Sequence, residues 1–302
     1  MDFSLIRVIG VLFGFACCVP VSSTGQNIVL GVLEDHAGVY VGDPYFRAVR
    51  IVFKKSGPDW QLFLDDCPDQ NCLKKTASGY PADMTWTIAF DGKNLGQITS
   101  RTPKEFENYS RVGQEEITSA GPVPTVGERS TEFAGMIAAP VYRPLVANSQ
   151  PYFRDPDVWR PAQLPGRLVT LLREQFRKNF PTAENCVDSD EGVPKPWPYT
   201  DDDIRVLKSY SSRNGWSMSR LKLEPYSCDG PADDPFLDHW FAISPHQDVQ
   251  LLGSGMWLVD AGDYDNDGKS ELLFSVDRYD RGGYELFYDD FRKHVTFEFS
   301  YH

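Results

Sequence analysis

The sequence is short of positive charge and of long apolar segments. It contains 43 aspartates and glutamates against 30 lysines and arginines, which gives a formal net charge of −13 over 302 residues. A protein that binds nucleic acid presents a basic face to the phosphates, so this balance excludes nucleic acid as the expected partner. Beyond residue 23 no apolar run approaches the ~20 residues that a spanning helix needs, so we expect no transmembrane segment in the mature chain.

Familiar catalytic motifs are also missing. The five histidines are dispersed and form neither a His-x-His pair nor an HExxH zinc motif. The chain has no P-loop, no GxGxxG fingerprint and no GxSxG nucleophile turn. The sequence therefore favours a binding or interaction module over an enzyme. The alternative is a secreted hydrolase whose acid–base pair forms only in the fold, with Asp233 or Asp238 beside His239. A purely structural envelope component is a third hypothesis.

The N-terminus carries a short apolar run. Residues 8–19 are almost wholly apolar, which suits the hydrophobic core of a signal peptide and is too short to span a bilayer. We therefore predict a cleavable signal peptide over residues 1–23, with cleavage after Gly25 as the alternative, and a secreted or periplasmic protein. A lipoprotein modified at Cys17 or Cys18 is less consistent with the sequence, because a bulky phenylalanine precedes these cysteines where a small residue is required.

Cysteine is scarce, but its placement agrees with export. Outside the predicted signal peptide the chain has four cysteines, Cys67, Cys72, Cys186 and Cys228. An even number in an oxidising compartment predicts disulfides. The residues between Cys67 and Cys72 have a turn composition, so the simplest of the three possible pairings joins these two and leaves Cys186 to pair with Cys228. A zinc site is the rival interpretation, but no CxxC pair or nearby histidine supports it.

Extended segments dominate residues 24–145, the predicted N-terminal β region. Runs rich in β-branched and aromatic residues are separated by glycine, proline and aspartate turn signals. The expected strands cover residues 28–33, 46–53, 60–64, 84–90 and 95–99. Asp91-Gly92 lies between the last two runs and predicts a hairpin turn.

The middle of the chain is rich in proline. Twelve of the 22 prolines lie between residues 122 and 198, so we expect few long strands in the segment 146–203. One amphipathic helix is predicted within it, over residues 165–180, because leucines and phenylalanines recur on one face and charged residues on the other.

Strands return over residues 204–302, the predicted C-terminal β region. The expected strands cover residues 204–211, 216–223, 239–243, 249–252, 256–259, 271–276, 284–288 and 294–301. This regular series is typical of two four-stranded antiparallel sheets, as in the blades of a propeller. We therefore predict a mostly β, propeller-like protein with one helix, and a β-sandwich or an α+β fold as the alternatives.

One loop carries recognisable chemistry. It reads Asp263-Tyr-Asp265-Asn-Asp267-Gly268-Lys269-Ser-Glu271. Alternating carboxylates in a tight loop face a common centre, and the glycine allows the chain to wrap around an ion. Oxygen ligands in an exported protein favour Ca²⁺ over a transition metal. The loop is not an EF-hand, because Phe274 stands at position 12, where that motif needs a bidentate glutamate.

The loop resembles the calcium loop of FG-GAP/VCBS-type repeats, as in the propellers of integrin α-chains. In those repeats a D-x-D-x-D-G-x-x-[DE] loop joins two strands of a blade, and apolar strand-like residues flank the loop here too. The resemblance implies that the side chains of Asp263, Asp265, Asp267 and Glu271 and the carbonyl of Lys269 bind Ca²⁺. It covers about twenty residues strongly and the final hundred loosely, with a single copy of the loop, and the rest of the chain resembles no family that we recognise.

The partner is expected to be a protein or a glycan. Sugar rings stack on exposed aromatic side chains, and seven tryptophans are present. Trp60, Trp86, Trp240 and Trp257 fall within expected strands and are assigned to the core. Trp159 and Trp197 lie in proline-rich loops and are the candidates for an exposed platform.

Overall fold

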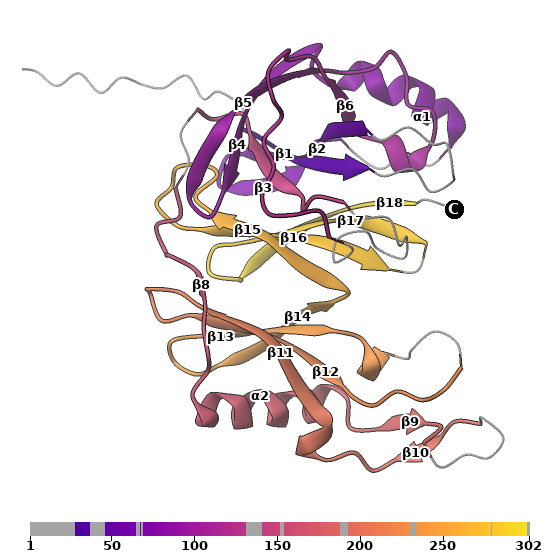
Figure 1. The fold of residues 1–302 in the computed structure, drawn as a ribbon, viewed down its shortest axis with the longest axis vertical. Coiled ribbons are helices and arrows are strands. Elements are labelled where there is room, and N and C mark those ends of the chain that lie inside the picture. The colour runs from indigo at the N-terminus through magenta and orange to yellow at the C-terminus, as the bar shows by residue number, and fades with distance from the viewer. Residues whose placement is uncertain are drawn as a thin grey trace, which may run out of the picture.

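The protein is represented by a computed structural model that describes residues 28–36, 46–64, 67, 69–130, 141–151, 154–187, 193–229, 234–278 and 280–300. The predicted signal peptide lies outside these residues. The fold is mostly β, as expected from the sequence, and its sheets are antiparallel. Figure 1 shows them stacked along the long axis of the molecule.

The N-terminal half forms a closed barrel. Its strands are β1 (Val29–His36), β2 (Phe46–Ser56), β4 (Asp83–Phe90), β5 (Lys93–Arg101), β6 (Gln114–Ile117) and β7 (Leu145–Asn148), and β3 (Asp59–Leu62) extends the sheet beside β2. They lie in the order β1-β7-β4-β5-β6-β2, and β2 pairs back with β1 to close the ring. The five expected strands and the Asp91-Gly92 turn are present. Closure of the barrel was not expected from the sequence.

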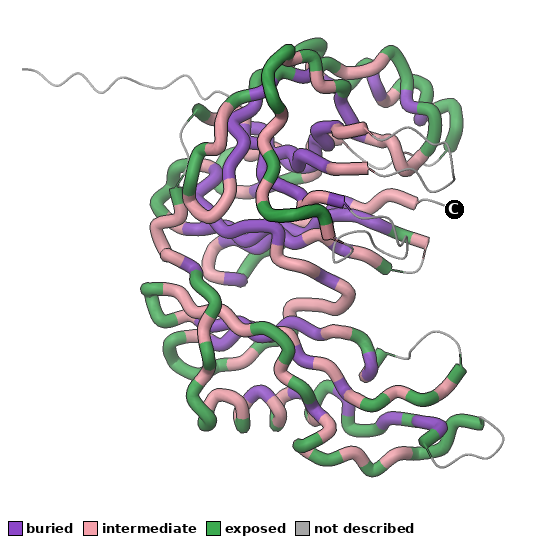
Figure 2. Tube along the Cα trace, viewed as in Figure 1, coloured by how far each residue is buried: buried purple, intermediate pink, exposed green. Residues whose placement is uncertain are grey.

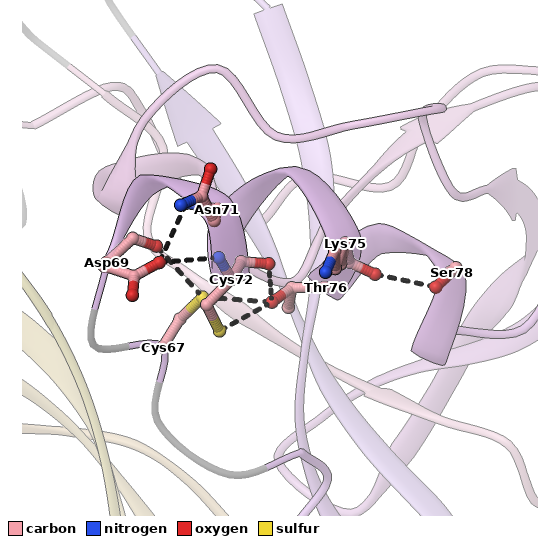
Figure 3. The surroundings of a disulfide bond; sticks show 7 residues. All are labelled: Cys67, Asp69, Asn71, Cys72, Lys75, Thr76 and Ser78. Atoms are coloured by element: carbon pink, nitrogen blue, oxygen red, sulfur yellow. Dashed lines mark hydrogen bonds between the residues drawn. A yellow bond between two sulfur atoms is a disulfide. The ribbon is translucent and has the colours of Figure 1, made fainter.

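A short helix follows β3. It comprises α1 (Gln70–Thr76) and continues into η1 (Ala77–Gly79), where the sequence predicted only a turn. Asp69 is the N-cap of this helix: its carboxylate accepts hydrogen bonds from the backbone N–H groups of Asn71 and Cys72 at 2.8 and 2.9 Å. The disulfide between Cys67 and Cys72 fixes the entry to this helix, as Figure 3 shows, and this pairing is confirmed.

Two further antiparallel sheets follow the barrel. We call the first the lower sheet; it contains β8 (Arg160–Pro161), β11 (Ile204–Ser211), β12 (Ser217–Leu223), β13 (His239–Ile243) and β14 (Val249–Ser254). The second, the middle sheet, contains β15 (Met256–Gly262), β16 (Glu271–Arg278), β17 (Arg281–Tyr288) and β18 (Lys293–Ser300). The eight expected strands of the C-terminal region are thus present as two consecutive meanders. The described strands give these two sheets beside a barrel and do not show a propeller.

The predicted helix is present as α2 (Gly166–Asn179), and it is followed by the small hairpin of β9 (Ala183–Asn185) and β10 (Lys195–Trp197). Three single-turn helices complete the described elements: η2 (Tyr109–Arg111), η3 (Asp201–Asp203) and η4 (Asp234–Phe236). The second disulfide joins Cys186 to Cys228, as predicted. Within the described ranges, none of the helices combines the length and the apolar character needed to cross a bilayer.

The apolar cores follow the stacking order. One core fills the barrel and reaches α1, and a second lies between the outer face of the barrel and the middle sheet. A third lies between the middle and lower sheets, and a fourth between the lower sheet and α2. The middle sheet is therefore buried on both faces, which Figure 2 shows as a band of buried residues across the molecule. Leu272 and Phe274 face the lower sheet, whereas Leu273 between them faces the barrel.

Candidate metal centre

The acidic loop connects β15 to β16, two neighbouring strands of the middle sheet. The strands pair up to Gly262 and Glu271, so the loop begins and ends at adjacent backbone positions. Asn266 and Gly268 have φ angles of 62° and 91°, a left-handed conformation that glycine and asparagine adopt at low cost. These two residues reverse the direction of the backbone within the loop, between the aspartates.

The three aspartates converge. Asp263, Asp265 and Asp267 each offer one carboxylate oxygen, and these atoms all lie within 4.8 Å of one another. Backbone N–H groups of the loop hold the carboxylates in place. The N–H of Gly268 donates to Asp263 Oδ2 at 3.0 Å, that of Asp267 to Asp265 Oδ1 at 3.1 Å, and that of Lys269 to Asp267 Oδ1 at 2.8 Å.

The donor set fits a hard cation. Asp263 is 1% exposed, and its Oδ1 atom is buried without a hydrogen-bond partner. Burial raises the pKa of Asp263, and the negative charges of Asp265 and Asp267 add to the rise. Ionised carboxylates packed this closely are unfavourable unless a positive charge neutralises them. The three converging carboxylates could therefore hold a cation that binds oxygen ligands, as Ca²⁺ does.

The two remaining predicted ligands lie beside this cluster. Glu271 is 2% exposed, and its Oε2 atom accepts a hydrogen bond from the N–H of Tyr264 at 2.7 Å. Burial raises the pKa of Glu271 well above its usual range. The ammonium group of Lys269 lies 3.1 Å from Asp289 and 3.5 Å from Asp290, so this side chain points to the turn between β17 and β18. Ligation by Glu271 and by the carbonyl of Lys269 remains a prediction.

The segment that leaves the barrel supports the loop from one side. The N–H of Asp263 donates to the carbonyl of Arg154 at 2.8 Å. Ser270 is held twice: its N–H donates to Asp157 Oδ2 at 2.9 Å, and its hydroxyl donates to Asp155 Oδ1 at 2.7 Å. More than a hundred residues separate the partners in the sequence, and no sequence signal connects them.

The barrel contacts the loop from the other side. Lys55 of β2 forms an ion pair with Asp265. A pocket of about 530 Å³ opens at this point, and its lining includes Lys55, Asp265, Asp267, Glu271 and Lys293. The loop thus lies where the barrel, the middle sheet and the connecting segment meet. Sequence reasoning found the loop and missed these supporting residues.

The residues of the alternative acid–base site are arranged differently. His239 is 2% exposed and packs against Phe176 and Phe180 of the α2 region, with ring centroids 5.9 and 4.3 Å away. Its Nε2 atom lies 2.6 Å from the carbonyl oxygen of Asp234, and burial lowers its pKa. Asp238 instead faces Arg220 at 3.5 Å. Asp233 lies outside the described residues. The imidazole of His239 is thus buried in an aromatic core in this structure.

The two candidate aromatic platforms pack against other rings. Trp159 is 6% exposed and packs edge-on against Phe291, with ring centroids 5.9 Å apart. Trp197 stacks on Phe236 at 5.9 Å and is half-buried. The expectation of an exposed platform is therefore wrong for Trp159, whose ring fills the core between the middle and lower sheets, whereas Trp197 packs against the core beside α2 and stays partly exposed.

Comparison with known proteins identifies no family for this chain. No protein-family model, no curated protein and no solved structure matches it.

Proposed function

We propose that this chain is an exported calcium-binding β protein that acts as a binding or interaction module, and that Ca²⁺ has a mainly structural role in it. The observation that carries the proposal is the buried Oδ1 atom of Asp263, which has no hydrogen-bond partner and lies in a cluster of three converging carboxylates. Export is supported by the apolar run at residues 8–19 and by two disulfides, which persist in oxidising compartments.

The resemblance to FG-GAP/VCBS-type repeats has local support. The acidic loop joins the first two strands of a four-stranded antiparallel sheet, which is the context that the resemblance implies. We propose that Asp263, Asp265, Asp267, Glu271 and the carbonyl of Lys269 hold Ca²⁺ at this sheet. When bound, the ion would neutralise the carboxylates and so favour the folded state.

The structural role follows from what the loop touches. It contacts the connecting segment through Arg154 and Asp157, and the barrel through Lys55. Fixing the loop therefore fixes three parts of the molecule relative to one another. Extracellular calcium modules need only a Kd on the order of 10⁻⁴–10⁻³ M, because calcium is abundant there.

A thermal melt tests the calcium site. At about 10 mM CaCl₂, a site with a Kd near 0.1 mM should raise the melting temperature by about 5 °C relative to chelator, and MgCl₂ should raise it less. The double variant Asp265→Asn/Asp267→Asn should not respond to calcium. Glu105→Gln/Glu107→Gln is the matched control, since it removes the same charge from exposed residues of the barrel and should respond as the unmodified protein does.

Equal melting temperatures in calcium and in chelator would reject the metal site. The proposed binding role is tested separately, by capture from the exported fraction in calcium and in chelator. A protein or glycan ligand retained by the unmodified protein and lost by the double variant would support it, and failure to retain any ligand in either condition would count against it.

A further inference from the structure

Among the described residues outside the loop, Lys55 places its cationic group closest to a carboxylate of the loop, and it belongs to a different part of the fold. It lies near the end of β2 in the barrel, where it pairs with Trp60 of β3. Its ammonium group contacts the carboxylate of Asp265. The two side chains are 16% and 2% exposed, so water screens this ion pair far less than it screens a surface pair.

Two aromatic rings hold the ammonium group in position. Lys55 Nζ lies 5.4 Å from the ring centroid of Trp60 and 5.7 Å from that of Tyr288, which are distances of cation–π contacts. Both rings are buried, at 3% and 7% exposure. The lysine is therefore fixed at the edge of the metal centre by β3 and β17 together, and does not sample the surface freely.

The position of Lys55 places it in competition with a metal ion. Asp265 is one of the three converging carboxylates, and its Oδ1 atom already accepts the N–H of Asp267. Its Oδ2 atom is the one that faces Lys55. A divalent cation and an ammonium group that share one carboxylate repel each other, so each weakens the binding of the other.

We propose that Lys55 is a built-in counter-ion of the acidic loop, which neutralises Asp265 when no metal is bound and which lowers the affinity of the site for calcium. This inference rests on the proposed function, because it concerns the same site. It adds a residue of the barrel to the site, and it makes the contact between β2 and the loop depend on whether calcium is present.

Lys293 supplies a matched control. It lines the same pocket and also lies over the ring of Tyr288, at 5.9 Å from the centroid. Its ammonium group, however, pairs with Asp59 at 2.6 Å and not with a carboxylate of the loop. Lys293→Met removes the same charge as Lys55→Met from the same pocket, but it leaves the ion pair with Asp265 intact.

Calcium titration by calorimetry tests the inference. Lys55→Met should bind calcium about tenfold more tightly than the unmodified protein, which corresponds to about 1.4 kcal/mol. Lys293→Met should change the affinity less than about twofold, since its charge is already paired and the remaining effect is screened. Unchanged or weaker binding by Lys55→Met would overturn the inference. No calcium binding by any of these proteins would instead reject the metal site itself.

The rise in melting temperature that calcium produces is a second readout, and a purely structural role of Lys55 would not change it. Without metal, Lys55→Met should melt at a lower temperature than the unmodified protein, because Asp265 has lost its counter-ion. The rise produced by saturating calcium should be larger in Lys55→Met, because the ion no longer competes with an ammonium group. A variant that is destabilised equally with and without calcium would contradict the proposal.

Discussion

Asp260 of β15 is a buried carboxylate outside the metal loop. It is 6% exposed, and its Oδ1 atom accepts a hydrogen bond at 3.0 Å from the N–H of Asp91, in the turn between β4 and β5. Its Oδ2 atom has no hydrogen-bond partner among the described residues. Burial raises the pKa of Asp260 from 3.8 to about 7, although the hydrogen bond from Asp91 and the charge of Arg143 act to lower it. Near neutral pH the residue therefore titrates inside the fold.

This titration makes stability depend on pH. The pKa is higher in the folded than in the unfolded state, so stability falls as pH rises from about 4 to about 7, and the full cost is present above pH 7. Asp260→Asn keeps an oxygen that can accept the N–H of Asp91 and cannot ionise. We expect it to raise the free energy of unfolding at pH 8 by on the order of 2–4 kcal/mol, and by much less at pH 4.

Urea unfolding at pH 4 and pH 8, with chelator present, measures this difference. Asp202→Asn is the control, because Asp202 is exposed and its loss should change stability little at either pH. If Asp260→Asn were less stable than the unmodified protein at pH 8, the ionised carboxylate would be stabilising, and the argument from burial would fail.

The sequence identified some residues of the metal centre and not others. Asp263, Asp265 and Asp267 follow a local spacing, and a pattern of nine residues is enough to find them. Lys55 and Asp157 reach the loop only because the barrel and the connecting segment pack against it. Such contacts join residues more than a hundred positions apart, so no local pattern encodes them. His239, which acidic neighbours in the sequence made a candidate base, lies instead against the ring of Phe180 in an aromatic core, and no local pattern indicated that packing.

Among the elements, α2 is the one whose sequence pattern and packing agree most closely. Its apolar face covers the lower sheet, and Phe176 on that face is fully buried. This ring contacts those of Phe180 and Phe241, with centroids 4.9 and 6.2 Å away. The helix therefore protects one face of the lower sheet from water.

Removing that ring tests how strongly the helix stabilises the lower sheet. Phe176→Ala should lower the free energy of unfolding by about 3–5 kcal/mol, because it leaves a cavity in a packed core. Glu174→Ala on the exposed face of the same helix should cost at most about 0.5 kcal/mol. Chemical denaturation of both variants provides the comparison. Similar decreases in the free energy of unfolding for the two variants would mean that the apolar face of the helix does not stabilise the lower sheet.

The elements themselves were more predictable than their arrangement. Strands such as β4 and β5 follow from β-branched residues and a glycine turn, and α2 follows from its periodicity. The helix α1 was missed because its seven residues depend on the cap by Asp69 and on a disulfide. The barrel was missed because β1 pairs with β7, and no local signal specifies a pairing across more than a hundred residues.

Across the whole molecule, one buried polar network joins the barrel to the middle sheet. Glu34 of β1 forms a two-point ion pair with Arg50 of β2, at 2.6 and 3.0 Å, and accepts a hydrogen bond from the hydroxyl of Tyr284 at 2.8 Å. Burial raises the pKa of Glu34, but the charge of Arg50 and the hydrogen bond and charge of His36 together outweigh burial and hold that pKa well below its usual range. The carboxylate therefore stays ionised and fully bonded inside the interface.

Tyr284→Phe removes a single bond of this network. It should lower the free energy of unfolding by about 1.5–3 kcal/mol, the range for a hydrogen bond to a charged group. Tyr210→Phe, in the lower sheet and outside the network, is the control for loss of a tyrosine hydroxyl. Urea denaturation followed by fluorescence and by circular dichroism should give one shared transition in each case. A loss no larger than that of the control would show that the network does not hold the two layers together.

The middle sheet has a further consequence for how the molecule is made. Its strands, residues 256–300, come last in the described chain, yet they lie between two layers that come earlier. During synthesis, the outer face of the barrel and one face of the lower sheet therefore stay exposed to solvent until residues 256–300 have been made and can pack between them. A fragment that ends before residue 256 would keep two apolar surfaces open to self-association, so neither layer is a unit that can be cut out and studied alone.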